Sequence, residues 1–102
     1  MIIYNVTVNV SDDIHDEWLA WMREKHIPDV LATGFFSEHK LMKILSRQAD
    51  EEGFTYAVQY FCKNLNELDA YQKNFAPALQ KEHTAKFEGK FAAFRTVMEI
   101  VD

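Results

Sequence analysis

At 102 residues the chain is long enough for one domain, residues 1–102, and too short for two. Apolar residues make up 48% and charged residues 26%, as in ordinary globular proteins, and the net charge of −5 argues against binding to nucleic acid or anionic membranes, which attract basic clusters. The single cysteine, Cys62, excludes an internal disulfide, and no apolar run approaches the about 20 residues that cross a bilayer, so we expect a cytoplasmic protein without a signal peptide.

Residues 2–10 alternate with a period of two and are rich in β-branched side chains, which predicts a half-buried strand. One face carries Ile2, Tyr4, Val6, Val8 and Val10, and the other carries Ile3, Asn5, Thr7 and Asn9. This regularity favours a place in the interior of a sheet, with later strands on either side.

The segment Ser11-Asp12-Asp13 has the form of a helix N-terminus, with a capping side chain followed by carboxylates in the first turn. Apolar residues then recur every three or four positions, which predicts a helix to about Lys25. We expect Pro28 to restart the chain in a short helical turn to Thr33, which Gly34 ends in a left-handed conformation.

Residues 35–47 form a long extended candidate with two mixed faces, which indicates an edge strand. Residues 48–53 are polar, end in glycine and predict a hairpin loop. Residues 54–62 predict a second interior strand, with Phe54, Tyr56, Val58, Tyr60 and Cys62 on one face and Thr55, Ala57, Gln59 and Phe61 on the other. Both faces are apolar enough to be covered, so the sequence leaves open which one turns toward the helices.

Asn64 and Glu67 have the spacing of a capping box before a helix whose apolar stripe contains Leu65, Leu68, Tyr71 and Phe75. Pro77 should break this helix and begin another, with Leu79, His83 and Phe87 on one stripe, before Gly89 ends it. Residues 91–101 predict the last strand, and we expect its side chains Ala93, Arg95, Val97 and Glu99 to face away from the helices.

The predicted order of elements is βαββαβ. Right-handed crossovers then place both helical segments on one face of an antiparallel sheet with the strand order 4-1-3-2, which is the α+β ferredoxin-like plait. The uncovered face would combine Ile3, Asn5 and Thr7 with apolar and aromatic side chains of the other strands. That mixture favours a homodimer packed sheet against sheet, whereas a monomer with a semi-apolar face is the alternative.

Three segments of the chain carry a resemblance to a known family. They are Ile3-Tyr4-Asn5-Val6-Thr7-Val8, then Trp18-Leu19-Ala20-Trp21-Met22 with His26-Ile27-Pro28-Asp29-Val30, and Phe91-Ala92-Ala93-Phe94-Arg95-Thr96. The chain resembles the dimeric α/β barrel superfamily, and more narrowly a small bacterial family known only as a domain of unknown function. The resemblance implies two ferredoxin-like plaits packed sheet to sheet and a ligand pocket between helices and sheet. Other members of the superfamily use this pocket for cofactor-independent oxygenation, haem degradation or isomerisation, but none of their catalytic sets maps onto this sequence.

Four histidines are available for chemistry, His15, His26, His39 and His83. No pair has the spacing of a zinc site, so we assign no metal and no cofactor. His83 lies on an apolar stripe where a haem ligand or a general base could sit, but a packed core histidine has the same pattern. His26 could face a pocket or cap the first helix, while His15 and His39 are expected to be exposed.

The remaining candidate ligand-binding residues are Tyr4, Trp18, Trp21 and Arg95. Trp18 and Trp21 suit core packing or the wall of a site for a planar ligand, with tyrosine hydroxyls opposite. Arg95 and Glu99 share a face of the last predicted strand, which favours a cross-strand or cross-dimer ion pair. The alternative is that Arg95 binds an anionic substrate group near Asn5 or Thr7.

The sequence therefore supports a protein of unknown activity, best interpreted as a homodimeric small-molecule-binding or interaction module. The alternative is a cofactor-independent enzyme, monooxygenase- or isomerase-like, with its pocket between helices and sheet, and a third hypothesis is haem binding through His83 or His26. The last two depend on the superfamily resemblance, and a shared fold does not confer an activity. A cavity of about 300 Å³ or more would favour the enzyme.

Overall fold

The computed structural model describes residues 1–47 and 49–102. Its strands are β1 (Ile2–Val10), β2 (Phe36–Lys43), β3 (Phe54–Cys62) and β4 (Phe91–Glu99), and they form one antiparallel sheet in the order β2-β3-β1-β4. Read from the other edge, this is the predicted order 4-1-3-2 of the ferredoxin-like plait. β1 lies in the interior and pairs with β3 on one side and β4 on the other, as its regular alternation predicted.

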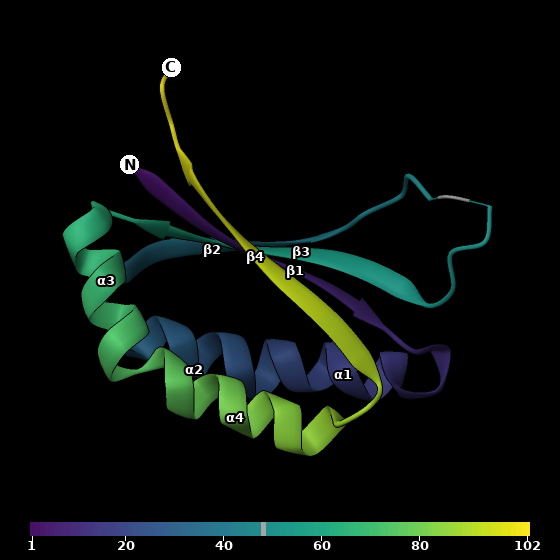
Figure 1. The fold of residues 1–102 in the computed structure, drawn as a ribbon. Coiled ribbons are helices and arrows are strands. Elements are labelled where there is room, and N and C mark those ends of the chain that lie inside the picture. Colours follow the sequence, from purple (N-terminus) through teal and green to yellow (C-terminus); the bar gives the residue numbers. More distant parts are fainter. Residues whose placement is uncertain (48) are drawn as a thin grey trace.

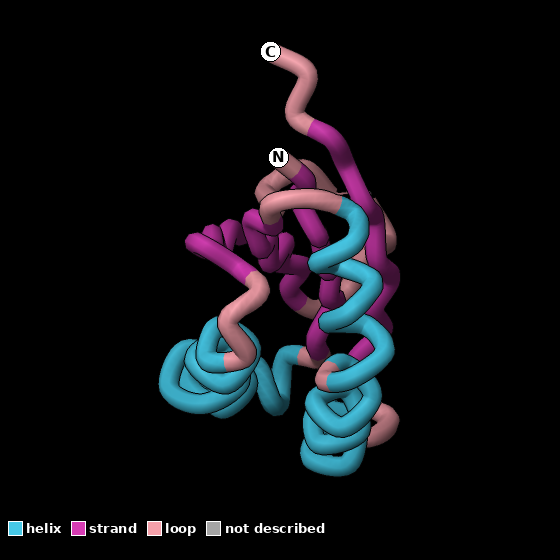
Figure 2. Tube along the Cα trace, turned by 90° about the vertical axis from the view of Figure 1, so that its left-hand side faces the viewer, coloured by secondary structure: helices cyan, strands magenta, loops and turns pink. Residues whose placement is uncertain are grey.

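All the helices lie on one side of this sheet (Figures 1 and 2). The first helical segment contains α1 (His15–Trp21) and α2 (Ile27–Ala32), and the second contains α3 (Leu65–Asn74) and α4 (Ala76–Phe87). The two chain ends lie at the same end of the sheet, where the N–H of Ile100 donates to the carbonyl of Met1. Among the described residues no helix combines the length and the apolar character needed to cross a bilayer.

The first helical segment differs from the prediction of a break near residue 26. A 3-10 turn at Asp12–Ile14 leads into α1, and a π-helical turn at Met22–His26 connects α1 to α2 without leaving helical backbone angles. The N–H of Ile27 donates to the carbonyl of Met22, five residues back. Pro28 has no N–H to donate, and the wider turn before it accommodates the proline ring without interrupting the helix.

The second helical segment follows the prediction closely. The side chain of Asn64 accepts a hydrogen bond from the N–H of Glu67 at 2.9 Å, which caps α3. The helix ends at Asn74, Phe75 leaves the helical conformation, and Pro77 stands in the first turn of α4. The chain then turns at Gly89, which has a positive φ of 75°.

The register between β1 and β3 shows which face of β3 points toward the helices. Tyr4 pairs with Tyr60 and Val8 pairs with Tyr56 in the β1–β3 register, and paired residues share a face, so these tyrosines lie on the helical side. β2 is an edge strand as expected, but it ends at Lys43 rather than at Arg47 and contains a bulge between Phe36 and Glu38. The predicted loop 48–53 begins at residue 48, which is outside the described residues.

The orientation predicted for the last strand is wrong. Val8 pairs with Ala93 and Val6 pairs with Arg95, so Ala93 and Arg95 face the helices, and Phe94 faces away from them. The cause is the register, because the N–H of Ser11 donates to the carbonyl of Lys90 and places Phe91 opposite Val10. A backbone hydrogen bond thus determines a face that the side-chain pattern alone assigned incorrectly.

We call the side of the sheet away from the helices the open face. It carries Ile3, Asn5, Thr7, Asn9, Thr55, Ala57, Gln59, Phe61, Phe94, Thr96 and Met98 from the three strands β1, β3 and β4, with Glu38, Lys40 and Met42 from β2. The main core lies on the opposite side, between sheet and helices, and contains Trp18 and Phe87 among its most buried side chains.

Candidate functional site

A cavity of about 50 Å³ lies between the sheet and the helices, on the side of β1 and β4. Apolar side chains form much of its wall, namely Val6, Val8, Met22, Val30, Val58, Leu79, Phe91 and Ala93. Its polar lining consists of Tyr4, His26, Tyr60, Tyr71, Gln80, His83, Thr84 and Arg95. The cavity is larger than a single water needs but well below the roughly 300 Å³ of a pocket for a drug-sized ligand, so a ligand enclosed in it has few non-hydrogen atoms.

Four of the six candidate residues line this cavity: Tyr4 from β1, His26 from the π-helical turn, His83 from α4 and Arg95 from β4. Trp18 and Trp21 of α1 are not part of the lining. They lie behind the two histidines, where Trp18 hydrogen-bonds His83 and the ring of Trp21 packs on both imidazoles, with centroids 5.3 Å from His26 and 5.8 Å from His83. The two tryptophans therefore position the histidines rather than forming a wall for a ligand.

Trp18 determines the tautomer of the neutral His83 ring. Its indole Nε1–H can only donate, and it lies 2.9 Å from Nε2 of His83 in a buried contact, so Nε2 is the acceptor and the neutral ring carries its proton on Nδ1. Burial lowers the pKa of His83 to about 4, and the charge of Arg95 and a protonated His26 act in the same direction. His83 is therefore a neutral imidazole that presents an N–H donor at neutral pH.

This geometry removes two roles that the sequence left open for His83. A general base and a haem ligand both need a free lone pair on the imidazole, and the lone pair of His83 is engaged by Trp18. The cavity of about 50 Å³ is also far too small for a porphyrin as it stands. Haem therefore does not fit this site. Among the described residues no group of three or more histidine, cysteine or acidic side chains is arranged to hold a metal ion.

His26 has a different environment from His83. Its Nδ1 is buried without a hydrogen-bond partner, the sole such side-chain atom in the described part of the chain. Burial lowers the pKa of His26, and the carboxylates of Glu82 and Asp29 oppose this shift. The imidazole rings of His26 and His83 pack edge to face, with their centroids 5.7 Å apart. His26 is thus a neutral ring with an unsatisfied nitrogen, held in a wide helical turn of a kind often found at functional sites.

Arg95 contacts Tyr4 across the β1–β4 pair, where its Nε–H donates to the hydroxyl oxygen of Tyr4 at 3.1 Å. No cross-strand ion pair forms at Arg95, because no described carboxylate of its own chain lies within ion-pair distance. A cross-dimer pair stays a prediction. The proposed neighbours Asn5 and Thr7 are also wrong, because both lie on the open face. Arg95 is exposed and stands at the rim of the cavity.

Two tyrosines in the lining were not among the candidates. Tyr60 and Tyr71 pack around Tyr4, with ring centroids 6.2 Å and 5.9 Å from it. Burial raises the pKa of both hydroxyls well above the usual value, so they stay protonated and can donate. Tyr71 stood on the predicted apolar stripe of its helix, which was the available signal, whereas Tyr60 depended on the undecided face of β3.

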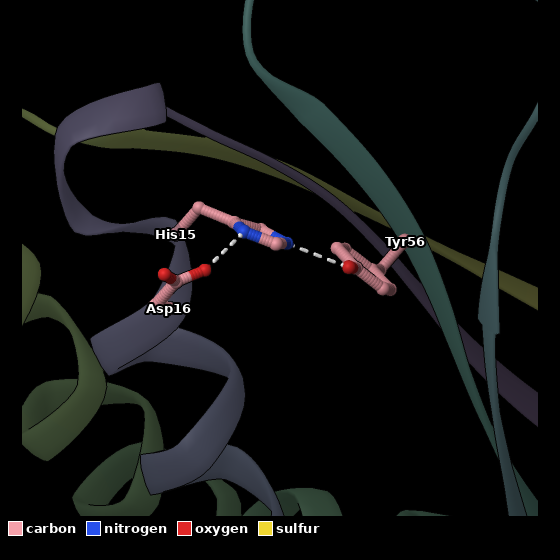
Figure 3. Close-up of polar contacts among 3 residues, drawn as sticks. All are labelled: His15, Asp16 and Tyr56. Atoms are coloured by element: carbon pink, nitrogen blue, oxygen red, sulfur yellow. Dashed lines mark hydrogen bonds and ion pairs between the residues drawn. The ribbon is translucent and has the colours of Figure 1, made fainter.

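His15 is not the exposed residue that the sequence suggested. Figure 3 shows its ring between Asp16 and Tyr56, with Nδ1 3.0 Å from the Asp16 carboxylate and Nε2 2.7 Å from the Tyr56 hydroxyl. The His15 ring also stacks on the ring of Phe54, with the two centroids 4.0 Å apart. The Asp16 carboxylate accepts, so Nδ1 donates, and in the neutral form of the ring Nε2 accepts a hydrogen bond from the Tyr56 hydroxyl. This contact ties the start of α1 to β3, and neither His15 nor Asp16 lines the cavity.

Solved structures with the same fold have low sequence identity to this chain. A dimeric ferredoxin-like protein from an uncultured marine organism is 12% identical, over 100% of this chain and 96% of its own, with a TM-score of 0.72. A Nitrosomonas europaea protein provisionally described as an antibiotic biosynthesis monooxygenase is 11% identical over 100% of both chains, with a TM-score of 0.67. A MhuD mutant, solved with two manganese protoporphyrin IX molecules per active site, is 13% identical over 100% of this chain and 96% of its own, with a TM-score of 0.66. At these identities the similarity shows the fold alone.

Comparison with curated proteins gives no significant match. The model of one family, described as a domain of unknown function (DUF4286), matches residues 1–101. This match spans nearly the whole chain, including β1 and β4 and every residue that lines the cavity. The chain therefore belongs to the DUF4286 family, a family of unknown function with, in this member, a ferredoxin-like fold.

Proposed function

We propose that this protein is a homodimer in which each protomer binds a small molecule in the cavity between helices and sheet. The observation that carries the proposal is the convergence of Tyr4, His26, His83 and Arg95 on one small, largely apolar cavity. A few converging polar groups on an apolar wall are typical of ligand sites. The free, buried Cys62 is consistent with the reducing cytoplasm, which we propose as the compartment.

The unsatisfied nitrogen of His26 supports a ligand rather than a packed core. Buried polar atoms in proteins are nearly always hydrogen-bonded, and leaving one unpaired costs about 1–3 kcal/mol. Nδ1 of His26 is buried and has no partner, although its ring lines a cavity that is large enough for more than a single water. A turn of the His26 ring toward the cavity would let a ligand or ordered water reach this nitrogen and remove the penalty.

The open face supports the homodimer. It combines polar side chains near its centre, such as Asn5 and Thr7, with exposed apolar ones toward β4, such as Phe94 and Met98. Interfaces between subunits have this composition, with apolar and aromatic residues beside polar ones that trap water. A structural neighbour described as dimeric has the same fold. A stable interface here would bury at least about 1,200 Å² in total.

A cofactor-independent enzyme is the second candidate, and His26 is the observation in its favour. A neutral imidazole has one nitrogen with a free lone pair, and for His26 no hydrogen bond within the described structure occupies it, so the ring can accept a proton from a bound substrate. The neighbour described as a monooxygenase has the same fold at low identity. If the protein is an enzyme, a bound ligand should be converted, and His26→Gln should abolish turnover while leaving the ligand bound. A ligand that binds and remains unchanged would favour the binding module.

The ligand proposal is tested by a fragment screen that uses ligand-observed NMR. Ala93→Leu adds carbon atoms to the cavity wall, so it should weaken a fragment that binds there by tenfold or more. Ala85→Leu is the matched control, since Ala85 is exposed on α4 and is not part of the lining. A library with no binder sensitive to Ala93→Leu would contradict the proposal.

The homodimer is tested by analytical ultracentrifugation at micromolar concentration. The wild type should sediment as a dimer of the 11.9 kDa chain. Phe94→Asp places a charge on the open face and should yield a monomer, because an unpaired charge is costly at an interface core. Leu65→Asp is the matched control, since Leu65 is 60% exposed and Phe94 is 62% exposed, but Leu65 begins α3. A monomeric wild type, or equal loss of dimer in both variants, would overturn the pairing.

A further inference from the structure

We propose that the cavity is a binding site for a small organic carboxylate, held at its rim by Arg95 and inside by hydroxyl and imidazole N–H donors. This inference rests on the proposed ligand-binding function and names the chemical class of the ligand. Three features of the site lead to it: an arginine without an acidic partner, a lining rich in donors, and an apolar inner wall.

The first feature is the unpaired charge of Arg95. The chain has 16 acidic residues against 11 basic ones, so acidic partners are plentiful. Of the 11 basic residues only Lys25, Lys73 and Lys90 pair with a described carboxylate, so the feature that distinguishes Arg95 is its place at the rim of the cavity. Arg95 has only the Tyr4 hydroxyl as a partner in the described structure, through Nε, which leaves both terminal nitrogens of the guanidinium available. Those two groups form the fork that binds a carboxylate through two parallel hydrogen bonds.

The second feature is the imbalance between donors and acceptors. The lining contains no aspartate or glutamate. Nδ1 of His83 carries a proton because Trp18 occupies Nε2, and the hydroxyls of Tyr60 and Tyr71 stay protonated. The hydroxyl of Tyr4 accepts from Arg95 and keeps its own proton to donate. An acceptor-rich anion satisfies such a site, whereas a cationic ligand would meet a like charge and few acceptors.

The third feature is the size and character of the inner wall. Side chains of valine, leucine, methionine, phenylalanine and alanine form the apolar wall, and the cavity of about 50 Å³ has room for only a few non-hydrogen atoms. A carboxylate bound by Arg95 and the donors near it would thus carry a short alkyl chain that lies against the apolar wall. We expect acids of roughly four to seven non-hydrogen atoms to fit, and dicarboxylates to be excluded because a second charge would lie against the apolar wall.

A second copy of the chain offers a rival partner for Arg95. Arg95 is exposed on β4, which is an edge strand with one unpaired side, and Glu99 lies on the same strand. If two copies paired in antiparallel fashion along β4, Arg95 of one chain could meet Glu99 of the other. The experiment below therefore includes Glu99→Gln, which removes that partner without touching the cavity lining.

The probes are butanoate and butanamide, which have the same shape and differ in charge. Each is titrated into the full-length protein at fixed ionic strength, and the indole N–H signals of Trp18 and Trp21 report binding, because both rings contact His83. We expect butanoate to bind the wild type with a millimolar Kd and at least tenfold more tightly than butanamide. In Arg95→Met the affinity for butanoate should fall to that for butanamide. Arg23→Met changes the net charge equally, lies outside the lining, and should leave both affinities unchanged.

The other outcomes separate this inference from the proposed function. Equal binding of the two probes, unaffected by Arg95→Met, overturns the carboxylate assignment but leaves a ligand cavity. Binding of neither probe while the fragment screen finds a binder sensitive to Ala93→Leu overturns the assignment in the same way. If neither probe binds and the fragment screen finds no binder sensitive to Ala93→Leu, both the inference and the proposed ligand-binding function are overturned. If butanoate binds the Glu99→Gln variant but not the wild type, then Arg95 pairs with Glu99 of a second copy in the wild type. That result overturns the inference.

Discussion

At the scale of single residues, the contact between Trp18 and His83 controls the chemistry of the cavity. Trp18 is fully buried and donates to Nε2 of His83 at 2.9 Å. A donor at this nitrogen stabilises the neutral imidazole, and it also prevents protonation unless the hydrogen bond breaks. One indole N–H therefore decides which imidazole nitrogen faces the cavity as a donor.

The first prediction concerns Trp18→Phe. Phenylalanine keeps an aromatic ring but offers no donor, so Nε2 of His83 becomes available for a proton and the pKa of His83 should rise above about 4, while burial still holds it below its ordinary value. The measurement is an NMR titration of the imidazole signals. Trp21→Phe is the control, because Trp21 packs on the His83 ring without a hydrogen bond and its replacement should leave the pKa of His83 low. An equal shift in both variants would mean that packing, and not the hydrogen bond, keeps His83 neutral.

The second prediction concerns the dependence of stability on pH. The pKa of His83 is about 4 in the folded chain against an ordinary value of 6.5, so between these values the unfolded chain binds more protons than the folded one. The free energy of unfolding should therefore fall as the pH is lowered from about 6.5 to about 4. His83→Gln keeps an acceptor for Trp18 and removes the titrating group, so its stability should fall less steeply over this range.

Urea unfolding of both proteins at several pH values measures that difference. His26 contributes in the same direction, because burial also lowers its pKa, so part of the slope should remain in His83→Gln. His39→Gln provides the control, since His39 is exposed on β2 and outside the cavity lining. Parallel curves for wild type and His83→Gln would contradict the low pKa of His83.

At the scale of elements, the turn that begins β3 depends on a close approach of backbone to backbone. Gly53 has a positive φ of 76°, and a Cβ added there would overlap the carbonyl oxygen of Val10 at the end of β1. Gly89 has nearly the same φ of 75° before β4, but a Cβ added at Gly89 would meet open space. The two glycines thus share a backbone conformation and differ in their surroundings.

The third prediction compares Gly53→Ala with Gly89→Ala. Both variants should lose about 1–2 kcal/mol of unfolding free energy from the left-handed backbone. Gly53→Ala should lose about 1–3 kcal/mol more, because Val10 must move away from the new methyl group. Chemical denaturation of the two variants measures the difference. Equal losses would show that the end of β1 moves at little free-energy cost. The left-handed backbone conformation would then account for most of the lost stability.

The elements also show what the sequence could predict. The strict alternation of β1 and the apolar stripe of α4 predicted the sheet and placed Tyr4 and His83 on the sides where the structure has them. Local patterns failed where a distant contact decides the outcome. The face of Arg95 depends on the backbone bond between Ser11 and Lys90, and the burial of His15 depends on Tyr56, 41 residues away.

Pro28 illustrates a second kind of failure. A proline after a helical stretch ordinarily marks a boundary, and we therefore expected a break near residue 26. The chain instead widens into the π-helical turn Met22–His26, which keeps the segment helical and brings His26 to the cavity. The apolar periodicity does not reveal one residue added to a turn, so the position of His26 became clear only with the structure.

At the scale of the whole molecule, the asymmetry of the two sheet faces is the main feature. Helices cover one face, and the open face has no covering element in the described structure (Figure 2). Two copies could pair through this face or along the free edge of β4, and these arrangements bury different residues. Thr7 lies on central strand β1 on the open face, so face pairing would cover it and edge pairing would leave it accessible.

The fourth prediction uses this difference. Thr7→Cys should react slowly with a thiol reagent in the dimer and quickly when Phe94→Asp is added, because the second change exposes the open face. Glu17→Cys on the outer surface of α1 is the control and should react quickly in both backgrounds. The native Cys62 is completely buried and should contribute little to the signal. If Phe94→Asp dissociates the dimer but Thr7→Cys reacts quickly both with and without it, then the copies pair along the β4 edge, since only face pairing shields the centre of the sheet.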